Sequence, residues 1–125
     1  MNEPDLETFD RLVRAAYAGL PAEFRALCGN VVIHVAEEAE REILDEMGIG
    51  DPLELSGLFE GVDFAEAAEA PPNHVHLYRR SILAEHRENR EIGLETLVTH
   101  VLVHEIGHHF GLSDEDMHAI EDAAE

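Results

Sequence analysis

Two histidines and a glutamate near the end of the chain form the pattern His104-Glu105-x-x-His108. If this segment is helical, His104 and His108 lie one turn apart on one face, where both imidazole rings can reach a single Zn²⁺. Glu105 then points beside the ion rather than at it, and it can accept a proton from water bound there. The pattern is typical of metal-assisted hydrolysis with Glu105 as the general base.

A third ligand is needed, because a catalytic zinc ion usually has three protein ligands and an open position. Gly111 and Asp114 follow His108 after three and six residues. Glycine lets the chain leave the helix and turn back, and a carboxylate oxygen binds zinc, so we expect Asp114 to be the third ligand. Asp114 also suits the first turn of a following helix, where the helix dipole favours a carboxylate, and His118 is the alternative ligand.

The other histidines have simpler explanations. His100 and His109 flank the motif residues and are expected to be structural. His74 and His76 share one face of a predicted strand, where solvation or packing is the ordinary role. Three side chains remain candidates for stabilising an oxyanion in the reaction, namely His76, His100 and Tyr78.

The motif needs a helix, and the residues before it predict one. Apolar residues recur at three- and four-residue spacing from Leu94 to Leu102 and run directly into the motif. Gly111 is expected to end this helix. Ser113, with Asp116 three residues later, predicts the capped start of a last short helix.

The remaining chain predicts helices and strands in mixed order. Periodic apolar residues and β-branched runs favour helices over residues 6–17, 22–27 and 38–47, and strands over residues 31–35, 55–59 and 74–81. Residues 48–73 are otherwise expected to be mostly irregular, since glycine and proline recur there. In the last strand Val75 and Leu77 point to one face, and His74, His76 and Tyr78 point to the other. This order predicts an α+β fold with a small sheet in one domain spanning residues 1–125.

Charge and composition restrict the partners and the location. Eight basic residues against 28 acidic ones give a net charge of −20, which disfavours nucleic acid as a partner. No apolar run is long enough to span a membrane. The N-terminus shows no basic and apolar leader, and the one cysteine, Cys28, suggests a buried thiol in a reducing compartment. We therefore expect a cytoplasmic protein.

The extended pattern His-Glu-x-x-His-x-x-Gly-x-x-Asp resembles the metzincin branch of the zinc peptidases, in the variant with aspartate as third ligand. More closely, the chain is similar to the minimal-zincin family of small bacterial metallopeptidases, also at residues 30–33, 57–61 and 76–80, over most of residues 5–121. The resemblance implies a zincin-like α+β fold with a small mixed sheet. It also implies a peptide substrate that adds to a sheet edge beside the motif helix, and residues 74–81 are the expected edge.

Three functions are therefore compared. The leading hypothesis is a zinc-dependent peptidase that acts on a peptide or protein substrate. The alternative is a non-catalytic metal-binding or interaction domain. It is favoured because only 14 residues follow Gly111, which are too few for the Met-turn and C-terminal subdomain of full metzincins. Met117 is expected on the last helix and not in a Met-turn. A metal-dependent ribonuclease is the third, and the charge of −20 disfavours the basic groove that it needs.

Overall fold

The computed structural model describes residues 3–61 and 72–124. In chain order, the described elements are α1 (Leu6–Ala18), α2 (Ala22–Cys28), β1 (Val31–Ala36), α3 (Arg41–Met47), the 3-10 helix η1 (Pro52–Glu54), β2 (Gly57–Glu60), β3 (Asn73–Tyr78), α4 (Arg79–Glu88), α5 (Leu94–His109) and α6 (Asp114–Ala123). They confirm the predicted α+β class.

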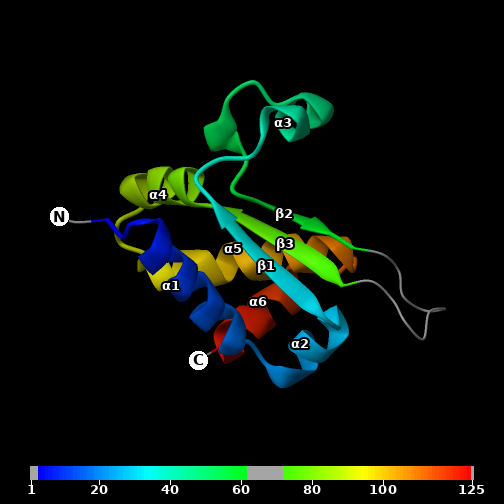
Figure 1. Ribbon diagram of the computed structural model, residues 1–125. Helices are drawn as coiled ribbons and strands as arrows, with labels where there is room; N and C mark the ends of the chain where they lie inside the picture. Colours follow the sequence, from blue (N-terminus) through cyan, green and yellow to red (C-terminus); the bar gives the residue numbers. More distant parts are fainter. Residues whose placement is uncertain (1–2, 62–71, 125) are drawn as a thin grey trace.

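The three strands form one mixed sheet in the order β1-β3-β2 (Figure 1). β1 and β3 run parallel, with Val31 opposite Asn73 and Ala36 opposite Tyr78. β2 runs antiparallel to β3, with Gly57 opposite Leu77. β3 is therefore the central strand, with a neighbour on each side.

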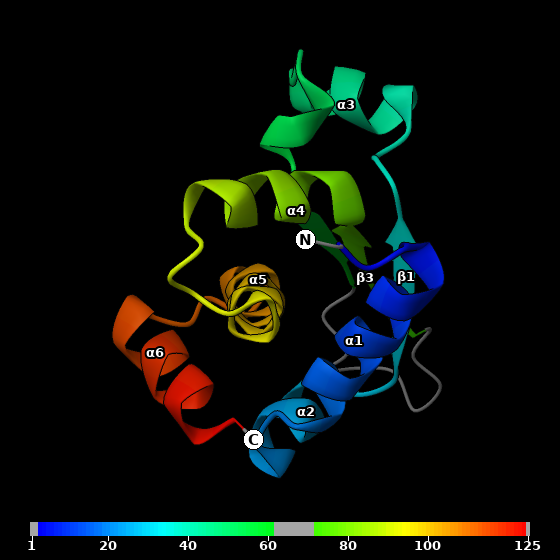
Figure 2. The same cartoon turned by 90° about the vertical axis from the view of Figure 1, so that its left-hand side faces the viewer.

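The main core lies between the inner face of this sheet and the helices α1 and α5. Val75 and Leu77 of β3 are 0% exposed and belong to the same cluster as Phe9 and Val13 of α1 and the buried side chains of α5. Figure 2 looks along α5 and shows it between α4, α6 and α1, with the strands beyond α1. This burial on several sides explains why α5, which carries the motif, is the most apolar helix of the fold.

A smaller cluster lies over one end of the sheet. It joins Ala39 and Leu44 from the α3 region to Leu55 and Tyr78. α3 stands above the strands in Figure 1, and its last turn ends at Gly48, which has a positive φ of 71°. The segment between β1 and β2 is thus anchored away from the motif helix.

Most predicted elements are confirmed, but several of their boundaries differ from the prediction. The strand expected over residues 74–81 ends at Tyr78, and Arg79 begins α4, a helix that the sequence did not predict. Ser81, Ile82 and Leu83 are all buried in succession, so the segment lacks the spacing that marks a one-sided helix. The predicted helix over 38–47 is shorter and begins at Arg41. Of the stretch expected to be irregular, residues 62–71 lie outside the described residues.

Cys28 is buried, and its thiol donates to the backbone oxygen of Phe24 at 3.2 Å. This confirms the interpretation of Cys28 as a small core residue. Among the described helices, none is both long enough and apolar enough to cross a membrane.

Candidate metal centre

The helix α5 holds the motif rigidly. Its apolar side chains Leu97, Val98, Leu102 and Ile106 are each at most 4% exposed. Burial of such side chains stabilises a helix by far more than its intrinsic propensity does. Three positions that remain at least partly open to solvent along one side, one turn apart, are taken by histidines.

Three histidine rings lie in a row on this side of α5, one turn apart. The rings of His100 and His104 are stacked with centroids 5.5 Å apart, and those of His104 and His108 lie 4.2 Å apart at an angle of 49°. His100 is held in place from α6, because its Nδ1 lies 2.9 Å from Oε1 of Glu121. The structure therefore brings together the two histidines that the motif predicts as ligands.

The electrostatic surroundings of His104 favour its neutral form. Burial lowers the pKa of His104, and the neighbouring His108 and His100 lower it further, while the carboxylates of Asp114 and Glu121 act in the opposite direction. Neutral imidazole is the form that ligates a metal ion. A donor set of two such rings and a nearby carboxylate is one that zinc accepts.

The side chain of Glu105 lies against β2. A Cβ atom placed on Gly57 would lie only 3.2 Å from Cγ of Glu105 and 3.0 Å from the backbone oxygen of His76. The glycine is therefore what lets the Glu105 side chain fit between α5 and the sheet edge. Burial raises the pKa of Glu105, with an opposing contribution from His108. A carboxylate with a raised pKa holds a proton more readily than one in open water.

The chain leaves α5 through a tight turn. Gly111 has a φ of 72°, which glycine adopts without steric cost. The backbone N–H of Leu112 donates to the oxygen of Gly107 at 2.9 Å, and that of Gly111 donates to His108 at 3.2 Å, which is the Schellman arrangement of a helix end. Ser113 then caps α6 by accepting from the N–H of Asp116 at 3.1 Å. Both sequence predictions for this region are confirmed.

Asp114 is the first residue of α6 and is exposed. Its charge acts on His104, so the turn does return the chain toward the histidine row. As the side chains stand, however, no three histidine, cysteine or acidic groups converge to hold a metal ion anywhere in residues 3–61 and 72–124. His118 is exposed further along α6. Asp114 as third ligand thus remains a prediction.

Two of the three oxyanion candidates are wrong. Val75 and Leu77 of β3 face the core that contains α5, and side chains alternate along a strand. His76 and Tyr78 therefore lie on the opposite face of the sheet, away from Glu105. Burial also raises the pKa of Tyr78 to about 12. Only His100, in the histidine row itself, stays a candidate.

His109 faces a third direction, as expected. Its ring packs against Phe59 of β2 at 4.6 Å and against Phe110 at 4.9 Å. Its Nε2 atom is buried and has no hydrogen-bond partner among the described residues. The contact with Phe59 supports the interpretation of His109 as a structural residue that joins α5 to the edge strand.

The expected docking edge also needs correction. β3 pairs with β1 and β2 on its two sides, so it has no free edge for an extended peptide. β1 and β2 are the two outer strands of the described sheet, and β2 is the one that contacts α5 at Glu105 and His109. The sequence missed this, because strand order depends on pairings between distant segments.

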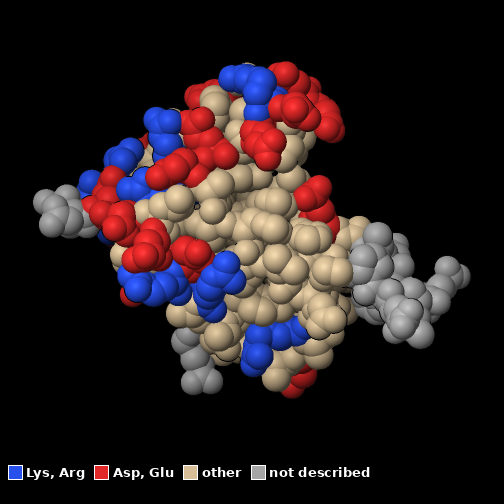
Figure 3. All heavy atoms as spheres, viewed as in Figure 1, with Lys and Arg blue, Asp and Glu red and all other residues tan. Residues whose placement is uncertain are grey.

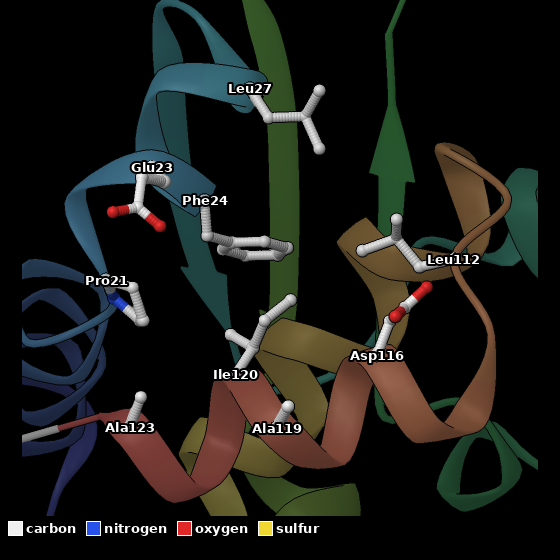
Figure 4. Close-up of a pocket in the computed structure, with 9 residues that line it drawn as sticks. All are labelled: Pro21, Glu23, Phe24, Leu27, Leu112, Asp116, Ala119, Ile120 and Ala123. Atoms are coloured by element: carbon white, nitrogen blue, oxygen red, sulfur yellow. The ribbon is translucent and has the colours of Figure 1, made fainter.

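A separate hollow lies between α2 and α6. It has a volume of about 450 Å³, and Figure 4 shows Phe24 of α2 facing Ile120 of α6 across it. Glu23 and Asp116 are its charged lining residues. None of the three motif residues His104, Glu105 and His108 lines this hollow, so it is distinct from the histidine row.

Comparison with known proteins shows the family of the chain. The family model described as zincin-like metallopeptidase matches residues 28–124, which include every strand and the helix α5. A search of curated proteins gave no match.

Proposed function

Because the chain belongs to the zincin-like metallopeptidase family, we propose that it is a zinc-dependent peptidase with His104, His108 and Asp114 as metal ligands. The observation that carries the proposal is the placement of Glu105 beside the two histidines, half-buried against Gly57 of the edge strand. A purely structural metal site has no need of a buried carboxylate next to its ligands.

A zinc ion bound at this site would activate a water molecule and polarise the substrate carbonyl. Glu105 would take the proton as the water oxygen adds to the carbonyl carbon, and would deliver it to the amide nitrogen as the C–N bond breaks. The raised pKa of Glu105 suits a group that must both accept and release a proton. His100, held by Glu121 at 2.9 Å, would keep the ring of His104 in position by stacking on it.

We further propose that the substrate is a peptide or a protein segment that binds in extended form. Among the described residues β2 has no strand on its outer side, where such a segment can pair with it through main-chain hydrogen bonds. The net charge of −20 disfavours RNA or DNA as the substrate. A reduced, buried Cys28 is consistent with a cytoplasmic location.

A non-catalytic metal-binding domain is the second candidate. Such a domain would need ligands for the metal ion but no general base. Glu105 distinguishes the two functions, because only a catalytic site requires it.

The test is cleavage of a peptide library by the zinc-loaded chain and by two variants. Glu105→Gln should retain zinc and folded stability but lose nearly all cleavage. Glu95→Gln is the matched control, because Glu95 lies in the exposed first turn of the same helix; it should cleave as the parent does. Equal cleavage by the parent and Glu105→Gln would contradict the peptidase assignment. Zinc binding without cleavage by any form would favour the second candidate.

A further inference from the structure

The outer face of the sheet carries a second group of histidines. His34 lies on β1, and His74 and His76 lie on β3. Nε2 of His34 is 2.9 Å from Nδ1 of His74, and the rings of His34 and His76 are stacked with centroids 4.6 Å apart. Nε2 of His76 is 2.8 Å from Oε1 of Glu60 on β2. Each of the three strands therefore contributes at least one side chain to this group.

Strand register explains why these residues meet. His34 is the direct partner of His76 in the parallel pair, and Glu60 is the direct partner of His74 in the antiparallel pair. Neighbouring strands lie about 4.8 Å apart, and residues two apart on a strand share a face at a spacing of about 6.6 Å. The Cα atoms of the four potential ligands therefore lie within a patch of about 10 Å by 7 Å.

Their chemistry is that of a metal site. Imidazole nitrogens suit zinc, copper and nickel, and a carboxylate oxygen can complete the set. Two nitrogens bound to one tetrahedral zinc ion at about 2.0–2.1 Å would lie about 3.3 Å apart. The contact between His34 and His74 is already near that separation.

We propose that His34, His74, His76 and Glu60 form a second site for a divalent transition-metal ion, on the sheet face opposite to α5. The site is independent of the proposed peptidase centre and links the three strands. As the side chains stand, no three of them converge on one point among the described residues; they pair two by two, His34 with His74 and His76 with Glu60. Rotation of the side chains toward a common point replaces these two contacts by bonds to the ion, as neutral imidazoles shift their hydrogen to the other ring nitrogen.

The surroundings allow a cation to enter. The three histidines are partly exposed and Glu60 is exposed. The positive charge of Arg14 contributes to lowering the pKa of His34. Arg14 forms an ion pair with Asp10 at 2.6 Å, which offsets this charge. Figure 3 shows this side of the molecule, where the area over the strands is largely free of Lys and Arg. The net charge of −20 also favours cation binding.

Zinc titration of the full chain tests the site. His104→Ala/His108→Ala removes the motif histidines, and this variant should still bind one Zn²⁺ per chain in calorimetry. Adding His34→Ala to this variant should weaken zinc binding by at least about 100-fold. Loss of a residue that only supports a metal ligand weakens binding by at most about 100-fold. Adding His86→Ala instead is the matched control, since His86 lies on α4 outside the cluster, and it should leave the affinity unchanged.

A second measurement leaves the four residues of the cluster unchanged, so its result does not depend on whether the His34 variant folds. In His104→Ala/His108→Ala, imidazole ¹⁵N resonances of His34, His74 and His76 should shift on addition of Zn²⁺. Unshifted resonances at saturating zinc, or no binding by this variant, would overturn the second site. If the parent binds one ion that is lost with His34→Ala but kept in His104→Ala/His108→Ala, the second site stands and the proposed peptidase centre fails.

Discussion

Met117 of α6 packs directly onto Gly107, the glycine between Glu105 and His108 in the motif helix. A Cβ atom at Gly107 would lie 2.5 Å from Sδ and 2.8 Å from Cγ of Met117. Met117 is itself only 3% exposed, so it has little room to move aside. The glycine of the motif thus sets how closely the last helix approaches the histidine row.

Gly107→Ala should therefore destabilise the fold. Overpacking in a filled core costs about 1–3 kcal/mol, whereas alanine gains about 1 kcal/mol over glycine inside a helix. We expect a net loss of roughly 1 kcal/mol in the free energy of unfolding, measured by urea denaturation. In a Met117→Ala background the same change should be neutral or stabilising. An equal loss in both backgrounds would show that Met117 is not the cause.

Gly57→Ala should disturb Glu105 from the side of the sheet. The new Cβ would contact the backbone oxygen of His76 at 3.0 Å and Cγ of Glu105 at 3.2 Å. Because a backbone atom cannot move aside cheaply, we expect a loss of about 1–3 kcal/mol in unfolding free energy and a reduced rate of any peptide cleavage.

Gly50→Ala is the control for this substitution, because no atom lies within 4 Å of a Cβ built there. It should leave both stability and cleavage close to those of the parent. Full cleavage by a folded Gly57→Ala variant would argue against a close fit between Glu105 and β2.

Asp114→Ala should weaken zinc binding at the motif. The carboxylate is the only ligand of the proposed set that comes from outside α5. Its loss should raise the zinc dissociation constant by about 100-fold or more, with little effect on stability, because Asp114 is exposed. The titration is made in a His34→Ala background, so that zinc binding at the proposed second site on the outer face of the sheet does not contribute. If His118→Ala weakens binding and Asp114→Ala does not, the third ligand is His118.

Asp5 should make the stability of α1 depend on pH. The backbone N–H of Thr8 donates to Oδ1 of Asp5 at 2.8 Å, and this hydrogen bond lowers the pKa of the Asp5 carboxyl. Because the pKa is lower in the folded state, the ionised cap stabilises the fold above about pH 3.9, the value in an unfolded chain. That stabilisation is lost as the pH falls through the folded-state pKa.

Asp5→Ala should accordingly lower the melting temperature at pH 7, and the difference from the parent should shrink below about pH 4. Asp122→Asn is the control, since Asp122 lies exposed near the end of α6. A difference in melting temperature that stays constant from pH 7 to pH 3 would mean that ionisation of Asp5 does not contribute.

Local patterns determined much of this protein. The spacing of apolar residues before His104 predicted the motif helix, and Gly111 and Ser113 marked its end and the start of α6. Alternation around Val75 and Leu77 predicted which residues of β3 share a face, and the structure buries the face of these two. Such predictions succeed because helix period, strand period and capping depend on residues within a few positions of one another.

Tertiary structure decided what depends on distant pairings. The strand order made β3 central and left β2 as the edge beside Glu105, and no pattern within residues 74–81 contains that information. The contact of His34 with His74 joins residues 40 positions apart, and Met117 on Gly107 joins two helices across a turn. Such contacts arise from the packing of whole elements, since one buried face can be covered by several arrangements with the same local sequence.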